Sequence, residues 1–223
     1  MFDANCLKLM FVAGSQDFYH IKGGKNDRIN ALLDTLELAL QSKITAFQFR
    51  QKGDLALQDP VEIKRLALEC QKLCKKYGAP FIINDEARLA LELKADGVHV
   101  GQEDMAIEEV VTLCQKRLFI GLSVNTLEQA LKAHHLDSVS YLGVGPIFPT
   151  PSKKDAKEVV GVELLKKIHD SGVKKPLIAI GGITTDNASK IQKFSGIAVI
   201  SAITQAKDKG LAVEKLLKMR EEF

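Results

Sequence analysis

The stretch from Thr45 to Gly53, TAFQFRQKG, joins an apolar strand pattern to a row of polar and cationic side chains. Successive side chains of a β-strand point to opposite faces, so Gln48, Arg50 and Lys52 should share one face. Arginine gives bidentate hydrogen bonds and lysine a mobile positive charge, and both suit a diphosphate. Taken by itself the stretch also fits the solvated face of an edge strand. The rest of the chain decides between these interpretations.

Short apolar runs alternate with amphipathic helical patterns on both sides of this stretch. They predict eight strands, at 7–12, from 46 onward, 81–83, 97–100, 118–122, 140–144, 177–180 and 197–200. Helices are expected between and after them, from a cap at Asp27 and over 60–78, 87–93, 106–115, 126–133, 161–170, 187–193 and 211–219. Residues 14–26 are expected to form a flexible connection.

Eight strand–helix units without a composition break predict a single (β/α)₈ TIM barrel domain spanning residues 1–223. Short apolar strands are typical of a parallel sheet that is buried on both faces. A doubly wound open sheet is the alternative. It usually carries a phosphate fingerprint after its first strand, and Ala13-Gly14-Ser15 does not match one.

Composition excludes several functional classes. A formal net charge of +3 with dispersed lysines predicts no nucleic-acid partner, and no apolar run reaches the roughly 18 residues of a membrane span. The N-terminus is a poor signal peptide. The four cysteines do not suggest a disulfide framework, and Cys70 and Cys74 fall on one helix face as core thiols. We expect a cytoplasmic protein.

Unusual polar residues follow nearly every predicted strand, and in a barrel these exits share the rim where active sites occur. Asp85 and Asp104 follow adjacent strands, so their carboxylates should converge as an Mg²⁺ site, although each could instead cap a helix. Glu86 and Glu103 are expected to point elsewhere. His99 should face the barrel interior, and the choice between packing and contacting a substrate ring is left open.

The last three exits also suit anions. The sixth, GPIFPTPSKKD, offers hydroxyls at Thr150 and Ser152 and a cation at Lys153. The seventh and eighth, AIGGI and VISA, offer small residues where TIM barrels bind phosphate through backbone N–H groups. No Ser-His-Asp or Cys-His set accompanies them, which points to loss of a diphosphate rather than to hydrolysis by a nucleophile.

These motifs together resemble the thiamine phosphate synthase family from the first strand to the last helix. QFRQK resembles the family's Gln-x-Arg-x-Lys diphosphate motif, and INDEARLALELKADGVHVGQED resembles its metal-binding segment. GLSVNT resembles its serine strand, GPIFPTPSKKD its thiazole-side loop, and AIGGIT with VISAI its phosphate cup. Two positions depart from the usual pattern, Glu86 where many members have Arg and Ser152 where Thr is usual.

The resemblance implies a magnesium-dependent transferase that condenses hydroxymethylpyrimidine diphosphate with thiazole phosphate, giving thiamine phosphate and pyrophosphate. The implied substrate-binding residues are Gln48, Phe49, Arg50, Gln51, Lys52, Asn84, Ser123, Thr150, Pro151, Ser152, Lys153, Gly182, Ile200 and Ser201. Among them Arg50, Lys52, Ser123 and Lys153 are the implied catalytic residues, and Asp85 and Asp104 the implied Mg²⁺ ligands. The implied partners are these small molecules, and homo-oligomerisation is left open.

Three alternatives use the same barrel. A thiazole tautomerase should not need the full diphosphate motif or the paired aspartates. A non-catalytic paralogue would bind thiazole phosphate or thiamine phosphate without turnover. A phosphate-sugar epimerase would need a general acid/base pair, and the sequence offers none that is well placed.

Overall fold

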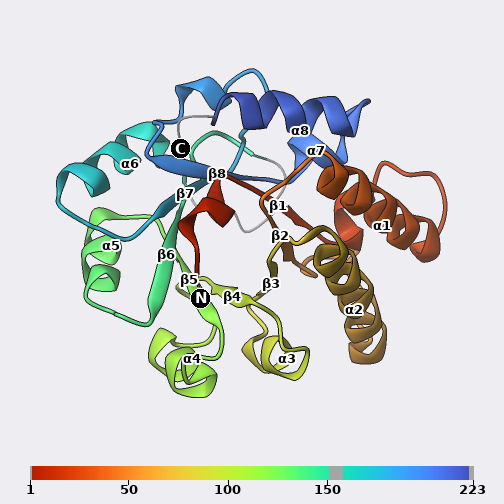
Figure 1. Cartoon of the computed structure of the whole chain (residues 1–223), viewed down its shortest axis with the longest axis horizontal. Helices are drawn as coiled ribbons and strands as arrows, with labels where there is room; N and C mark the ends of the chain where they lie inside the picture. Colours follow the sequence, from red (N-terminus) through yellow and green to blue (C-terminus); the bar gives the residue numbers. More distant parts are fainter. Residues whose placement is uncertain (1, 151–157, 221–223) are drawn as a thin grey trace.

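The computed structural model describes residues 2–150 and 158–220, which form a closed barrel of eight parallel strands inside a ring of helices (Figure 1). The strands are β1 (Leu9–Ala13), β2 (Ala46–Phe49), β3 (Phe81–Asn84), β4 (Gly97–Val100), β5 (Phe119–Val124), β6 (Val139–Val144), β7 (Leu177–Ile180) and β8 (Ser195–Val199). Each strand pairs with the next, and β8 returns to β1 with Ile197 opposite Leu9. The predicted TIM barrel is confirmed, and the open-sheet alternative is wrong.

Helices lie outside the strands and in the connections. The α-helices are α1 (Lys25–Gln41), α2 (Pro60–Tyr77), α3 (Ala87–Glu92), α4 (Ile107–Cys114), α5 (Leu127–His134), α6 (Gly161–Asp170), α7 (Ser201–Thr204) and α8 (Lys209–Lys218). Three short 3-10 helices are η1 (Ala4–Leu7), η2 (Ser15–Phe18) and η3 (Ala188–Lys190).

Helix α2 shows how local sequence sets these elements. The Asp59 carboxylate accepts a hydrogen bond from the Val61 N–H at 3.0 Å, and Pro60 occupies the first helical position. Gly78 ends the helix in the left-handed conformation, with φ +73°. Helix α1 begins three residues earlier than predicted, with Gly24 rather than Asp27 at the N-cap position. Asp27 is its third residue, and its carboxylate accepts from the Gly24 N–H at 2.7 Å.

Two predicted segments are wrong. Residues 14–26 are not simply a flexible connection, because η2 lies within them, Phe18 is buried and the Asp17 carboxylate accepts from the Gly14 N–H at 2.8 Å. The helix predicted at 187–193 is reduced to η3. The polar–apolar spacing of this stretch resembled a helix, but the short crossover to β8 has room for only one turn.

Arg220, just after α8, organises this shortened crossover. The side chain is 2 % exposed. Its guanidinium donates to the carbonyl oxygens of Ala188 at 2.8 Å, Ile191 at 3.0 Å, Gln192 at 3.1 Å and Ser195 at 3.3 Å. A fork of several donors suits a set of convergent carbonyls. A side chain from the end of the chain thus satisfies the carbonyl groups that a longer helix would pair internally.

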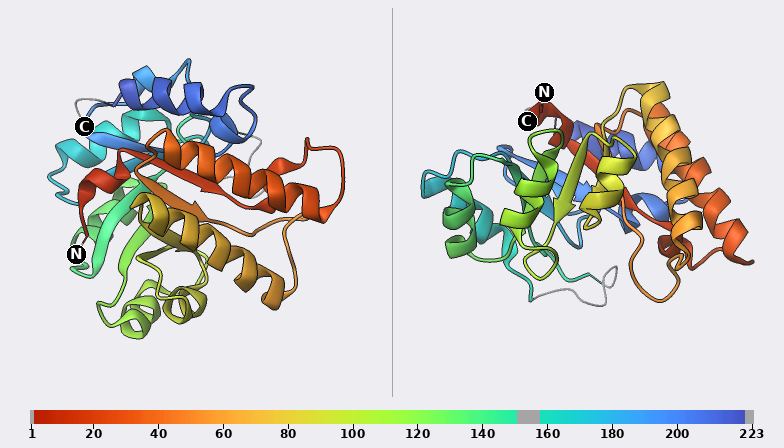
Figure 2. Two further views of the ribbon diagram at one scale, coloured as in Figure 1. Left: turned by 45° about the vertical axis from the view of Figure 1, so that its right-hand side comes forward. Right: turned by 90° about the horizontal axis from the view of Figure 1, so that it is seen from below.

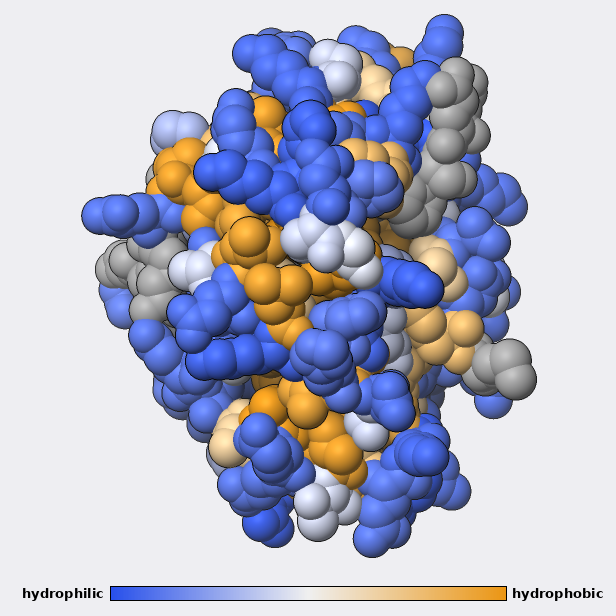
Figure 3. Space-filling view, turned by 90° about the vertical axis from the view of Figure 1, so that its left-hand side faces the viewer, coloured by the Kyte–Doolittle hydropathy of each residue, from blue (hydrophilic) through white to orange (hydrophobic). Residues whose placement is uncertain are grey.

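The core has an inner and an outer layer. The inner one lies within the barrel and includes Leu7 of η1 together with Met10, Ile82 and Ile178. The N-terminal segment that carries η1 lies beside the barrel strands (Figure 2). The outer one lies between the strands and the helices. On the side of α5 and α6, hydrophilic residues cover most of the surface and apolar residues reach it in the gaps (Figure 3). No helix among the described residues is long and apolar enough to span a membrane.

Candidate active site at the carboxyl ends of the strands

A cavity of about 170 Å³ opens at the carboxyl ends of the strands. Its lining includes side chains or backbone from the exits of β2 through β8. The lining contains eleven residues that the sequence assigned to the site, namely Gln48, Arg50, Lys52, Asn84, Asp85, Asp104, Ser123, Thr150, Gly182, Ile200 and Ser201. The barrel therefore brings together residues that are distant in the sequence.

The β2 exit follows the predicted alternation. Gln48, Arg50 and Lys52 line the cavity. Phe49 is not part of the lining and packs against Phe81 in the outer core, with ring centroids 6.4 Å apart. Gln51 also lies outside it, and its side-chain oxygen accepts from the Leu57 N–H at 3.1 Å. Both residues were included because they belong to the QFRQK motif, but their side chains face away from the cavity.

The backbone of Arg50 is held from the first strand exit. Its N–H donates to the Ala13 carbonyl at 3.0 Å, and its carbonyl accepts from the Gln16 side chain at 2.8 Å. A Cβ atom on Gly14 would lie 2.0 Å from that carbonyl oxygen, so this approach requires glycine. The Arg50 side chain is only 4 % exposed, and the cavity is where it meets the exterior.

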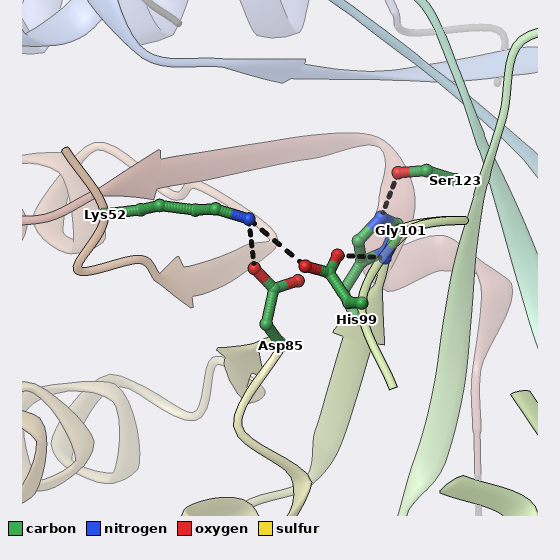
Figure 4. A network of polar contacts seen from close by, with 6 residues as sticks. Lys52, Asp85, His99, Gly101 and Ser123 are labelled. Atoms are coloured by element: carbon green, nitrogen blue, oxygen red, sulfur yellow. Dashed lines mark hydrogen bonds and ion pairs between the residues drawn. The ribbon is translucent and has the colours of Figure 1, made fainter. Parts of the chain in front are cut away.

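Asp85 and Asp104 converge on one cationic atom, as Figure 4 shows for Asp85 and Lys52. Lys52 Nζ lies 3.0 Å from Asp85 Oδ2 and 3.2 Å from Asp104 Oδ1. The other oxygen of Asp104 accepts from the Gly101 N–H at 2.9 Å. Asp85 has φ +63°, an uncommon conformation for a residue with a side chain, and it turns the chain out of β3.

The acidic pair titrates unequally. Burial raises the pKa of Asp85, and the adjacent Asp104 raises it further, while Lys52 opposes both effects. Burial also acts to raise the pKa of Asp104, but its hydrogen bonds, first with Asp85 and then with the Gly101 N–H, lower it overall. Burial disfavours the charged form of Lys52, yet its two carboxylate partners raise its pKa. A neighbouring cation, here Lys52, therefore favours the ionised form of both carboxyl groups.

The donor set fits Mg²⁺ bound together with a phosphate ligand. The described residues contain no group of three or more His, Cys, Asp or Glu side chains arranged around a metal position. Two carboxylates that already share a cation do suit Mg²⁺, because this ion commonly takes one or two carboxylates and completes its shell with phosphate oxygens and water. Asp85 and Asp104 are the residues that would hold it.

His99 lies beneath the cavity between two hydroxyl groups. Its Nδ1 is 3.0 Å from Tyr141 Oη, and its Nε2 is 2.8 Å from Ser123 Oγ, a contact also drawn in Figure 4. The side chain is 8 % exposed and contributes to the cavity lining. The sequence placed His99 in the barrel interior, which is confirmed, but it did not identify Tyr141 as its partner.

The opposite side of the rim is built from backbone. Gly182 has φ +66°, and a Cβ atom there would lie 2.5 Å from the Pro149 carbonyl oxygen, so the β6 and β7 exits pack closely. The Asn187 side chain donates to the Gly182 carbonyl at 2.9 Å. Ser201 starts α7 directly after β8. Pro151, Ser152 and Lys153 lie outside the described residues.

Sequence reasoning missed other residues of the lining. Gln102 donates from its side chain to the Ser123 carbonyl at 2.6 Å. Asn125 donates to the Gly145 carbonyl, which holds the β6 exit. Glu103 also lines the cavity, so the expectation that it points elsewhere is wrong. Strand alternation does not continue into the turn after β4, and position after a strand end was the signal that could have identified all three.

Comparison with known proteins gives a consistent result. A family model described as thiamine monophosphate synthase matches residues 18–203. A thiamine-phosphate synthase of Helicobacter pylori is 94% identical over 218 residues, which cover 98% of this chain and 99% of the relative. That of Pasteurella multocida is 50% identical over 213 residues, with 95% of each chain covered.

Solved structures extend this likeness to three dimensions. A thiamine phosphate pyrophosphorylase from Pyrococcus furiosus has a TM-score of 0.81 and 36% identity, and the match covers 98% of both chains. A 3-hexulose-6-phosphate synthase matches with a TM-score of 0.61 at 15% identity, over 95% of this chain and 99% of that one. The second likeness shows a shared fold alone.

Proposed function

The chain belongs to the thiamine monophosphate synthase family, and from that premise we propose how its rim residues carry out the reaction. The enzyme is a transferase of thiamine biosynthesis that joins hydroxymethylpyrimidine diphosphate to thiazole phosphate and releases pyrophosphate. The observation that carries the residue assignment is the convergence of cationic, acidic and glycine-lined exits on one cavity. The relatives described above are named thiamine-phosphate synthase or thiamine phosphate pyrophosphorylase, and none of these names supports the tautomerase alternative.

We assign the diphosphate to the side of the cavity formed by β2, β3 and β4. Arg50 and Lys52 provide cationic hydrogen-bond donors there, and Gln48 and Asn84 provide amides. Asp85 and Asp104 would hold Mg²⁺ beside them. When bound, Mg²⁺ supplies positive charge that neutralises diphosphate oxygens.

We assign the thiazole phosphate to the exits of β6, β7 and β8. Gly182, Ile200 and Ser201 line the cavity there, together with Thr150. Close backbone approach suits a phosphate group, since N–H donors reach it without an intervening side chain. Ser152 keeps the contact with the thiazole phosphate that the family resemblance implies. Lys153 keeps its implied contact with the departing diphosphate.

The bond-breaking step requires stabilisation of the departing diphosphate. The aminopyrimidine can share the positive charge left when the C–O bond breaks, so the path is dissociative. Arg50 and Lys52 then stabilise the departing diphosphate by preorganised charge. The thiazole nitrogen is already a nucleophile, and holding it in line suffices without a general base.

The test is release of pyrophosphate from the purified protein. We expect release to require both substrates and Mg²⁺, with thiamine phosphate formed in equal amount. Controls omit each substrate and the metal in turn. Asp104→Asn should lose most of the activity, whereas Glu86→Gln, whose carboxylate is absent from the cavity lining, should retain it. Full activity of Asp104→Asn would refute the metal assignment.

Three broader features complete the proposal. Residues 1–223 act as a single catalytic domain, which is supported by one closed barrel across the described residues. The location is cytoplasmic, which is supported by four cysteines that are all buried and unpaired. The small-molecule substrates are the partners.

A further inference from the structure

A buried chain of hydrogen bonds runs beneath the cavity and ends at Ser123. Tyr141 lies at its inner end, and His99 joins it to the Ser123 hydroxyl. Tyr141 is fully buried, so it has no access to water. The direction of each hydrogen bond can therefore be worked out by asking which atoms are able to accept.

The chain begins with a donor. Burial raises the pKa of the Tyr141 phenol, because the charged form would lose its contact with water. Tyr141 keeps its proton and must donate it. The acceptor within hydrogen-bond distance is His99 Nδ1, at 3.0 Å.

The donor-to-acceptor direction of the hydrogen bonds continues through the His99 imidazole. A neutral histidine has one donor and one acceptor nitrogen, so acceptance at Nδ1 places the proton on Nε2. His99 Nε2 then donates to Ser123 Oγ at 2.8 Å. With its oxygen accepting from below, the Ser123 hydroxyl directs its own proton into the cavity.

Two glycines hold the imidazole in this orientation. A Cβ atom on Gly121 would lie 2.2 Å from Tyr141 Cζ and 2.5 Å from His99 Nδ1. One on Gly143 would lie 2.9 Å from His99 Cε1. The two rings fill the space that these glycines leave, and their centroids are 5.5 Å apart. The imidazole thus has a built site and little freedom to turn.

We propose that His99 and Tyr141 are positioning residues, which hold the Ser123 hydroxyl as a hydrogen-bond donor toward an anionic oxygen of the diphosphate substrate. The contact between Ser123 and the diphosphate rests on the proposed function. The position of the proton on the His99 imidazole does not. A donor fits this place because anionic oxygens accept hydrogen bonds and cannot donate them.

The tautomer is tested directly by NMR of protein labelled with ¹⁵N-histidine, without substrate and at neutral pH. The resonances of His99 are those that disappear in His99→Asn. We expect a protonated Nε2 and an unprotonated Nδ1 in the wild type, and partial loss of this preference in Tyr141→Phe. A proton on Nδ1 in the wild type, in either the other tautomer or the imidazolium, would overturn the proposal. This NMR measurement tests the tautomer of His99 whether or not the protein makes thiamine phosphate.

The coupling to Ser123 is tested with a double-mutant cycle on kcat/KM for the pyrimidine diphosphate. We expect about a tenfold loss in Ser123→Ala and a similar loss in Tyr141→Phe, the scale of one oriented hydrogen bond to an anion. The double variant should be no worse than Ser123→Ala alone, and KM for the thiazole phosphate should not change. Losses that multiply would show that Tyr141 does not act through Ser123, and would refute the proposal.

Tyr77→Phe is the matched control. It removes a tyrosine hydroxyl that bonds Glu37 on the outer helices, far from the cavity, so kinetics should stay normal. Urea unfolding of every variant separates loss of positioning from loss of fold. If Tyr141→Phe does not fold, the tautomer of His99 in the wild type and the kinetics of Ser123→Ala still test the proposal.

Discussion

Lys52 occupies the place between two carboxylates where a metal ion would bind, and this makes a prediction about metal affinity. Lys52→Met removes the ammonium group but keeps most of the aliphatic chain. In the absence of diphosphate a metal ion must displace Lys52 from Asp85 and Asp104. We therefore expect the variant to bind the ion more tightly than the wild type does.

The magnitude follows from the two ion pairs. The Lys52 side chain is 41% exposed, so solvent screens both contacts, and each is worth about 0.2–1 kcal/mol. Displacing both therefore costs about 0.5–2 kcal/mol, which corresponds to about a 2–30-fold change in affinity. With pyrophosphate present the sign should reverse, because Lys52 then becomes a ligand of the anion rather than a competitor of the metal.

The assay is a titration with Mn²⁺ followed by electron paramagnetic resonance, with and without pyrophosphate. Lys64→Met is the matched control, because it removes a lysine of similar exposure, 44%, paired with Glu92 on the outer helices. It changes the net charge equally and should leave both affinities unchanged. Equal or weaker Mn²⁺ binding by Lys52→Met without pyrophosphate would refute the reasoning.

Three further predictions concern pH, a buried cation and a glycine. Burial raises the pKa of Cys6 to about 12, so the folded thiol stays protonated at pH values where the unfolded thiol ionises. The free energy of unfolding should therefore fall above about pH 9, by up to about 1.4 kcal/mol per pH unit for this group. Urea titrations at several pH values test this, and a slope that Cys6→Ala leaves unchanged would contradict it. Arg220→Met should lower the free energy of unfolding by about 3–5 kcal/mol, because four carbonyls lose the guanidinium donor, and only Ala188 and Gln192 among them also accept from a backbone N–H of this crossover. Arg220→Lys should recover part of this loss, and an unchanged urea midpoint in Arg220→Met would contradict the role given to the guanidinium. Gly182→Ala should raise KM for thiazole phosphate about tenfold or more, since its Cβ would meet backbone at 2.5 Å. In α8, a Cβ on Gly210 would meet the Ser42 hydroxyl at 3.1 Å and Asp208 Oδ1 at 3.6 Å, so Gly210→Ala should be neutral in initial-rate assays. Equal KM values in the two variants would refute this steric argument.

Much of the barrel could be predicted because strand and helix periods are local properties of the sequence. Gly161–Asp170 was predicted with the bounds that the structure shows for α6. Alternation along β2 correctly separated Gln48, Arg50 and Lys52 from their neighbours. Positions after strand ends converge because the strands of the barrel are parallel, and this placed Asp85 and Asp104 together.

The remainder depends on contacts between distant segments. Tyr141 became the partner of His99 only through the register of β4, β5 and β6. In this register Gly121 of β5 pairs with His99 of β4 on one side and with Tyr141 of β6 on the other. Phe49 and Gln51 show the opposite error, because a motif quoted as a string ignores which face each residue occupies. The one-turn η3 crossover depends on Arg220, whose side chain comes from beyond the last strand.

The pairing of β8 with β1 also orders events during synthesis. The described residues assigned to the diphosphate lie between 48 and 123, so they leave the ribosome well before β8 exists. Contacts between distant parts of a chain form late, and N-terminal segments have the first opportunity to fold. The acidic and cationic residues therefore meet an incomplete barrel until the last strand arrives. Competence for catalysis is gained only when the final segment, with Ser201 and Arg220, closes the ring.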